Sequence, residues 1–434
     1  MPKLRERLDA FRLAVDREWR FVLGVFAASG IGYMGSAAAP FIVQALLEFG
    51  LNHQQAGDLG TIELTTLALS TMLMTPLVAH VSHRKLAVGG VAVAMAGLVI
   101  SALSTAYFPM VIGRVIIGTG SGLAISGANA AVAAREDAER IFAIIWTMGG
   151  AITALLSINL PKVVANGNYP MGYGALILLS LLAAPLMIWV PIRPAAFGGG
   201  TDAAAAPTAG DPAPEGRFGV FGVSAMLVLA AMFVYAVAEQ AIWQFSFELT
   251  VEAGIPIDDT RWILGFTTLM GLAGGAVAAW LGLRIGRIFP FVFGFLCSAT
   301  GQSIWIAASG TGMLWVGGML WGFGFYFVSP YQMGLAAAID RRGRVAVLAG
   351  GLLNLGYGVG PTLGGRIRQY QLDQGLDRSV LIVAIAGMTL LSMLLCLLVT
   401  ARLERRSRAA AAARQIAGLE GSPAAESTDE RSDS

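Results

Sequence analysis

The stretch RPAAFGGGTDAAAAPTAGDPAPEGR, residues Arg193 to Arg217, divides the chain into two apolar halves. It is rich in Gly, Ala, Pro, Asp and Thr and has no apolar periodicity, which predicts a flexible linker. On both sides lie long runs without Asp, Glu, Lys or Arg, such as Phe21 to Leu46 and Phe218 to Ala238. Each run is long enough for a membrane-spanning helix, which needs about 20 residues.

Turn signals such as Asn166-Gly167-Asn168 and Ser309-Gly310 divide the longer runs, and six spanning segments then fall on each side of the linker. The predicted fold is an all-α membrane protein with twelve transmembrane helices in two pseudo-symmetric six-helix bundles. The predicted boundaries are an N-terminal segment at 1–19, a bundle at 20–192, the linker at 193–217, a second bundle at 218–402 and a disordered cytoplasmic tail at 403–434.

Composition supports a membrane protein and excludes other classes. Of 434 residues, 56% are hydrophobic and 13% are charged, and the mean hydropathy is +0.68. A soluble globule could not bury that much apolar surface. The formal net charge is only +2 and the basic residues are scattered, so we expect no nucleic-acid partner. Cys297 and Cys396 lie in separate apolar runs, so we expect them to pack as small hydrophobic residues.

Basic residues predict the orientation, because Lys and Arg concentrate in loops that stay in the cytoplasm. Basic loops follow the second, fourth, eighth and tenth predicted helices, on the same side as the linker and both termini; they contain Arg84, Lys85, Arg135, Arg140, Arg284, Arg287, Arg341, Arg342 and Arg344. We therefore expect a multi-pass protein of the inner (plasma) membrane, surrounded by lipid, with both termini in the cytoplasm. The charged segment 1–19 is expected to be a retained amphipathic segment.

Several motifs between residues 20 and 402 resemble the major facilitator superfamily. In VIGRVIIGTGSG, in the fourth predicted helix, Arg114 stands four residues before Gly118, as in that family's signature. The loops PLVAHVSHRK and AWLGLRIGR resemble its cytoplasmic signature, although His80 and Leu283 replace the acids. GYGVGPTLGG in the eleventh helix is similar to a signature that export members carry in the fifth. With the helix count and the linker, the resemblance implies a secondary transporter, not an enzyme, whose cavity is lined by helices one, four, seven and ten.

Three charged residues lie inside predicted helices, namely Glu63, Arg114 and Glu239. A charge at the bilayer centre costs roughly 2.5 to 3.5 kcal/mol on insertion scales, so such residues usually mark function. Glu239 is predicted to bind and release a coupling proton with Arg114 as its partner, because a carboxyl group binds a proton in a dry gap and releases it beside an arginine. For Arg114, an interhelical clamp on backbone carbonyls or on Glu63 is the alternative.

Polar and aromatic residues at helical spacing on four helices are predicted to line the substrate cavity. They are Tyr33, Ser121, Asn129, Tyr235, Trp243, Trp321, Phe325 and Ser329. Ordinary helix packing is the alternative for each aromatic residue. Glu63 is also predicted to form a gating ion pair with Arg366 or Arg368 at the outer end of the eleventh helix, with a static interfacial pair as the alternative.

These residues predict a secondary active transporter that moves a small organic solute by alternating access, with protons as the coupling ion. Arg114 and Trp321 would suit an organic anion or aromatic carboxylate. The alternatives are a proton-driven exporter of apolar or cationic compounds and a non-transporting sensor or scaffold. We expect a monomer without cofactor or metal, since His53, His80 and His83 lack companion ligands.

Overall fold

The computed structural model describes residues 2–74, 77–78, 80–133, 135, 138–192, 222–339 and 344–420. All regular elements in these ranges are helical. The first half contains α1 (Pro2–Phe49), α2 (His53–Met74), α3 (His83–Leu103), α4 (Tyr107–Ala133), α5 (Ala138–Val163), η1 (Ala165–Gly167), α6 (Tyr169–Ala183) and η2 (Ala184–Trp189). The second half contains α7 (Val223–Glu252), α8 (Ile257–Leu281), α9 (Ile288–Ile306), α10 (Thr311–Ile339), α11 (Arg344–Asp373) and α12 (Ser379–Glu420).

Twelve α-helices, six in each half, confirm the predicted fold class. In the described part of the chain, nine of them are long and apolar enough to cross a membrane. The other three, α2, α5 and α11, lie at the interface between the halves, where α2 packs on α11 and α5 on α8. Helices at such an interface face protein rather than lipid on one side, so they tolerate more polar residues.

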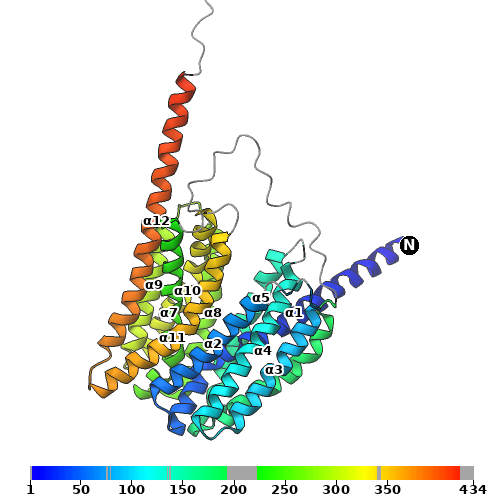
Figure 1. The fold of residues 1–434 in the computed structure, drawn as a ribbon, viewed down its shortest axis with the longest axis vertical. Coiled ribbons are helices and arrows are strands. Elements are labelled where there is room, and N and C mark those ends of the chain that lie inside the picture. Colours follow the sequence, from blue (N-terminus) through cyan, green and yellow to red (C-terminus); the bar gives the residue numbers. More distant parts are fainter. Residues whose placement is uncertain are drawn as a thin grey trace, which may run out of the picture.

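The two bundles meet at one end and diverge toward the end where α1 begins and α12 finishes (Figure 1). Where α2 and α11 meet, glycine is required. A Cβ on Gly57 would lie 2.3 Å from the carbonyl oxygen of Pro361, and one on Gly365 would lie 2.4 Å from that of His53. Small residues thus let the two backbones approach closely, as they do at many helix contacts in membranes.

Hydrogen bonds join the bundles at the closed end. Thr362 Oγ1 on α11 donates to Asp58 on α2 over 2.6 Å. Trp243 Nε1 on α7 donates to the carbonyl oxygen of Ser36 on α1 over 3.0 Å, and Arg261 on α8 donates to that of Ile158 on α5 over 3.0 Å. Three helix pairs therefore hold this end shut.

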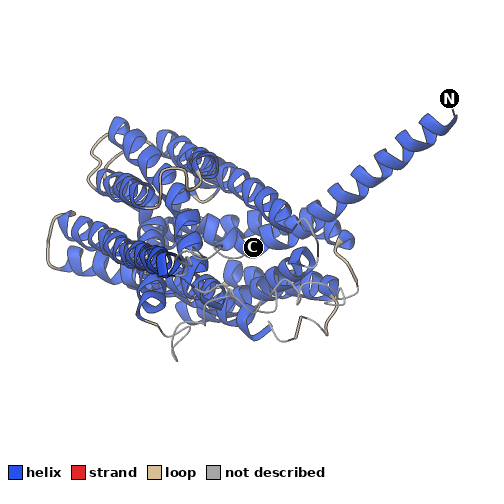
Figure 2. Ribbon diagram, turned by 90° about the horizontal axis from the view of Figure 1, so that it is seen from above, coloured by secondary structure: helices blue, strands red, loops and turns tan. Residues whose placement is uncertain are grey.

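The two terminal helices extend beyond the bundles. The first turns of α1 project away from the core (Figure 2). The tail was expected to be disordered from residue 403, but α12 continues to Glu420, so the expectation is wrong for 403–420. Its ARLERRSRAAAAARQ sequence is rich in Ala and Arg, which favour helix. The predicted linker at 193–217 and the end of the tail at 421–434 lie outside the described residues.

Candidate functional site

Glu239 lies in the middle of α7 and is 5% exposed. Its Oε1 accepts hydrogen bonds from Ser298 Oγ at 2.8 Å and from Gln302 Nε2 at 2.6 Å, both on α9. Its Oε2 accepts one from Trp321 Nε1 on α10 at 2.6 Å. No basic side chain of the described residues hydrogen-bonds to this carboxylate, so neutral donors alone bind it.

A second layer of hydrogen bonds orients these donors. Tyr235 OH donates to Ser298 Oγ over 3.1 Å, so the serine's own proton points toward Glu239. Thr389 Oγ1 on α12 donates to Gln302 Oε1 over 2.9 Å, which turns the amide NH₂ group toward the carboxylate. Groups from four helices thus form a donor cage that is complementary to an ionised carboxylate.

Arg114 belongs to a separate cluster in the first bundle. It donates to Glu63 Oε2 in a buried ion pair between α4 and α2, and its other terminal nitrogen donates to Tyr173 OH on α6 over 2.6 Å. Its guanidinium also lies 5.3 Å from the centre of the Tyr173 ring. The expected pairing of Arg114 with Glu239 is therefore corrected. Arg114 clamps Glu63 instead, because a buried guanidinium needs an acid in direct contact.

The expected gate pair is not formed in this structure. Glu63 binds Arg114, and Arg366 is exposed. Arg368 is 1% exposed and binds two acids of α7, Glu248 at 2.9 Å and Glu252. Glu248, Glu252 and Arg368 all lie within about two turns of the ends of their helices, α7 and α11, whereas Glu63 lies nearly three turns inside α2.

Besides the ion pair between Lys162 on α5 and Asp258 on α8, at 3.1 Å, a contact between the bundles at this end involves a histidine that the sequence did not single out for this role. His53 Nε2, on α2, lies 3.2 Å from Glu248 Oε1, which also binds Arg368. The acidic pair Glu248 and Glu252, near the end of α7, together with basic residues at the same end of α11, was the available signal. It could not show that His53 would be the partner from the other half.

The structure brings half of the predicted cavity residues together near Glu239. The Tyr235 and Phe325 ring centres are 6.1 Å apart, as are those of Trp243 and Trp321. Tyr33 is 40% exposed, and Asn129 and Ser329 are half-buried. Ser121 is buried against α1, where a Cβ on Gly32 would lie 3.2 Å from its carbonyl oxygen. The backbone at Ser121 therefore packs closely against α1.

Two further tyrosines, one of them within electrostatic reach of Glu239, did not stand out in the sequence. Tyr357 on α11 lies within electrostatic reach of Glu239, of Tyr326 on α10 and of Tyr33 on α1. Tyr33, Tyr326 and Tyr357, here called the tyrosine cluster, are all at least partly exposed. Tyr326 directly follows Phe325, and Tyr357 lies in the glycine-rich GYGVGPTLGG stretch, which drew attention to backbone packing rather than to its side chain.

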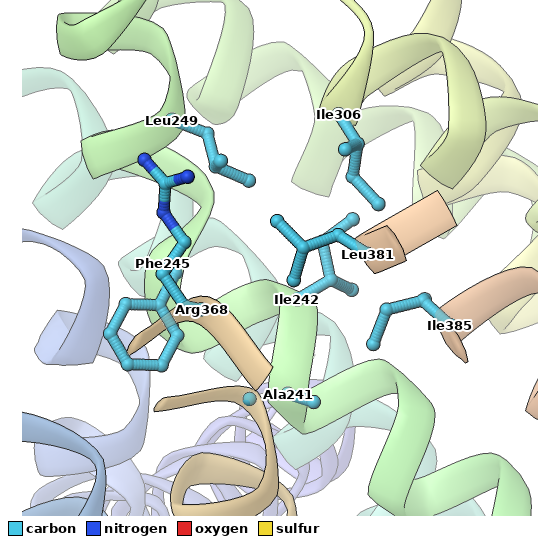
Figure 3. Close-up of a pocket in the computed structure, with 9 residues that line it drawn as sticks. Ala241, Ile242, Phe245, Leu249, Ile306, Arg368, Leu381 and Ile385 are labelled. Atoms are coloured by element: carbon cyan, nitrogen blue, oxygen red, sulfur yellow. The ribbon is translucent and has the colours of Figure 1, made fainter. Parts of the chain in front are cut away.

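Two small pockets lie at the closed end. One, beside Arg368, has mostly apolar walls from α7, α9, α11 and α12 (Figure 3). The other lies between the bundles and is lined in part by Glu63, Arg114 and Gln244. Each has room for about one water molecule, so neither accommodates an organic solute in this conformation.

Comparison with known proteins identifies the family. The sequence pattern described as Major Facilitator Superfamily matches residues 22–361. The chain belongs to the major facilitator superfamily. No curated protein matches this sequence.

Among solved structures, superfamily folds match over nearly the whole chain. The nucleoside transporter NupG is 12% identical with a TM-score of 0.69, covering 88% of this chain and 98% of that chain. A bacterial homologue of the human lysosomal transporter Spinster, inward-facing and occupied, is 13% identical with a TM-score of 0.65, covering 89% and 96%. A POT family transporter with a bound thioalcohol-conjugated peptide is 12% identical with a TM-score of 0.64, covering 89% and 96%. Such low identities show the fold alone.

Membership of the major facilitator superfamily confirms the predicted resemblance and the transporter class, and the protein is not an enzyme. It also fits the contacts that join the halves. The α2–α11, α5–α8 and α1–α7 pairs couple the two bundles, and both bundles contain a buried acid within a helix, such as Glu63 in the first and Glu239 in the second.

Proposed function

We propose that this protein is a proton-coupled secondary active transporter that moves a small organic solute by alternating access. In this proposal Glu239 binds and releases the coupling proton. The observation that supports it is the environment of Glu239, a buried carboxylate whose hydrogen-bond partners among the described residues are all neutral and include Ser298, Gln302 and Trp321. A buried charge without a counter-ion is costly, and a proton removes that cost.

The arrangement of the bundles supports alternating access. They touch at one end through Thr362 and Asp58 and through Trp243 and Ser36, and they diverge at the other (Figure 1). With both termini in the cytoplasm of a cell with an inner (plasma) membrane, the diverging end is the cytoplasmic one. The conformation is then inward-facing. Opening to the outside would break these contacts and the His53–Glu248 contact, and a monomer suffices for this cycle.

Transport by purified protein in proteoliposomes tests the proposal. A labelled panel of organic cations, organic anions and nucleosides is offered under an imposed pH gradient. We expect gradient-driven accumulation by the wild type and its loss in Glu239→Gln, which keeps the shape of the side chain but cannot exchange a proton. Asp373→Asn, at an exposed acid that accepts a hydrogen bond from Gln369, is the matched control. Undiminished accumulation by Glu239→Gln would overturn the assignment of Glu239.

Two alternatives are addressed by the same experiment. The anion site expected at Arg114 is not supported, because Glu63 and Tyr173 occupy its guanidinium. A sensor or scaffold would move no member of the panel even when correctly inserted, and would lack counterflow of unlabelled against labelled solute.

A further inference from the structure

We propose that the transported solute is an organic cation that binds beside Glu239, between the aromatic rings around it and the tyrosine cluster, in exchange for the coupling proton. The proposal rests on the proposed function and adds the substrate class. It assigns binding roles to Tyr326 and Tyr357, which the sequence analysis did not single out.

The distribution of charge inside the helices favours a cationic solute. The described arginines deep in the helices are already bound by acids. Arg114 binds Glu63, and Arg368 binds Glu248 and Glu252. Arginines held in this way cannot offer an anionic solute a free positive charge. Glu239 has the opposite character, since its donors are neutral and its negative charge is uncompensated. A cation would gain from this charge, an anion would be repelled, and a neutral solute would gain little.

The aromatic rings around Glu239 also favour a cationic solute. Trp321 and Tyr235 are buried at Glu239, and Phe325 packs on Tyr235. An ammonium group is attracted to the face of such rings, most strongly to tryptophan. The phenol oxygens of the tyrosine cluster add hydrogen-bond acceptors for N–H groups. Rings, phenols and one carboxylate together form a site of the kind that binds amines.

Exposure and lone pairs indicate the approach to the carboxylate. The tyrosine cluster contributes partly exposed rings from α1, α10 and α11, so it lies on the side that a solute reaches first. Two donors from α9 bind Oε1 of Glu239, and Trp321 Nε1 binds Oε2. The Tyr235 hydroxyl also lies within hydrogen-bond reach of the carboxylate, but it donates its single proton to Ser298. A carboxylate has about four lone-pair sites, so one remains for the ammonium group.

The cation and the proton cannot bind at the same time, because each neutralises the same carboxylate. The exchange is balanced: protonated Glu239 loses its proton to water, and the ionised carboxylate then binds the cation. Among the described residues, the titratable groups within electrostatic reach of Glu239 are Tyr235 on α7 and Tyr357 on α11. Tyr357 in turn lies within reach of Tyr326 on α10 and Tyr33 on α1. The side chains that α9 and α12 contribute to this network, those of Ser298, Gln302 and Thr389, do not titrate. Near neutral pH, Glu239 is thus the group that exchanges a proton.

Equilibrium binding to purified full-length protein tests the proposal with probes of matched shape. Tyramine, 4-ethylphenol and 3-(4-hydroxyphenyl)propionate share one aromatic frame with a cationic, neutral or anionic end, and tetraphenylphosphonium and tetraphenylborate form a bulkier pair of opposite charge. Isothermal titration is carried out at several pH values and in buffers of different ionisation enthalpy. We expect at least one cation to bind about tenfold or more tighter than its matched partners.

The affinity for the cation is expected to rise with pH as the competing proton is lost, with proton release visible in the buffer dependence of the heat. Glu239→Gln should lose about tenfold or more in cation affinity and all of this pH dependence. Tyr357→Phe keeps the ring and should lose less affinity than Tyr357→Ala, whereas Asp373→Asn should bind as the wild type does.

Three results would overturn the cation assignment: neither cation binds better than its matched partners, an anion binds best, or Glu239→Gln binds cations with unchanged affinity. Because binding is measured without a membrane or gradient, this outcome is distinguishable from failure of the proposed transport. Cation binding without gradient-driven flux would contradict only the transport, and proton-driven flux of an anion or a neutral nucleoside would contradict only the cation assignment.

Discussion

Trp321 Nε1 on α10 lies 2.6 Å from Glu239 Oε2 on α7. Both residues were expected at the cavity, where the tryptophan was expected to help bind a solute; its hydrogen bond to the acid was not expected. Through this contact, a movement of α10 relative to α7 changes the environment of the carboxylate.

Replacing Trp321 with Phe keeps most of the ring and removes the N–H donor. We expect proton-driven transport to fall about tenfold or more, because a buried oxygen of Glu239 loses a partner worth about 1 to 3 kcal/mol. Trp305→Phe is a matched control, since Trp305 is also buried but donates to the carbonyl oxygen of Ser246 at 3.0 Å. Initial rates in proteoliposomes and thermal unfolding are measured for both. Equal loss of transport in the two variants at equal stability would contradict a special role for Trp321.

Breaking the Arg114–Glu63 pair should destabilise the first bundle. Arg114→Met leaves Glu63 buried without a counter-ion, and Glu63→Gln leaves Arg114 buried without one. Removing one member of a buried ion pair costs about 3 to 5 kcal/mol. The double variant should recover a large part of that loss. Thermal unfolding in detergent of the single and double variants gives the coupling. Additive losses would show that the two side chains do not depend on each other.

The His53–Glu248 contact should favour closure of the outer end. His53→Ala removes the side chain that α2 offers to α7 at 3.2 Å, so the outward-open state should gain population, by about tenfold for a contribution near 1.4 kcal/mol. Distances between spin labels placed in the two bundles at that end report the change. His80→Ala, in the loop after α2 at the opposite end, is the control. A distribution unchanged from the wild type in His53→Ala would contradict this role.

Gly57 is predicted to be essential for the α2–α11 contact. In Gly57→Ala the added Cβ would meet the carbonyl oxygen of Pro361 at 2.3 Å, so the helices must separate, at a cost of about 1 to 3 kcal/mol. Gly89→Ala on α3 meets nothing within 4 Å and should be neutral or stabilising by about 0.5 to 1 kcal/mol. Thermal unfolding of the Gly57→Ala and Gly89→Ala variants measures the difference in their stability. Equal stability of the two variants would contradict the close approach.

Several features of the fold followed from the sequence because they depend on local patterns. Runs without charge, such as Phe21 to Leu46, must be helices that span lipid, since a bilayer leaves their backbone groups no other partners. The tail from residue 403 was misjudged for a related reason. Its polar composition was given more weight than the helix propensity of its alanines and arginines.

The residues of the candidate site were predictable as individuals but not as partners. Glu239, Trp321 and Tyr235 stood out because charged and polar aromatic side chains are rare and costly in lipid. Ser298 and Gln302 did not, since a serine and a glutamine in an apolar helix carry no distinguishing spacing. They became visible only when α9 was placed beside α7.

The sequence by itself determined that this chain crosses a membrane as two six-helix halves and that few ions lie inside, because the free energy of transfer into lipid acts on each residue separately. Tertiary structure decided which ion meets which. Arg114 lies beside Glu63 and Tyr173, Arg368 beside two acids of α7, and Glu239 within a cage of neutral donors. Such pairings depend on distances of a few ångströms between helices far apart in the chain, and helical periodicity carries no information about those distances.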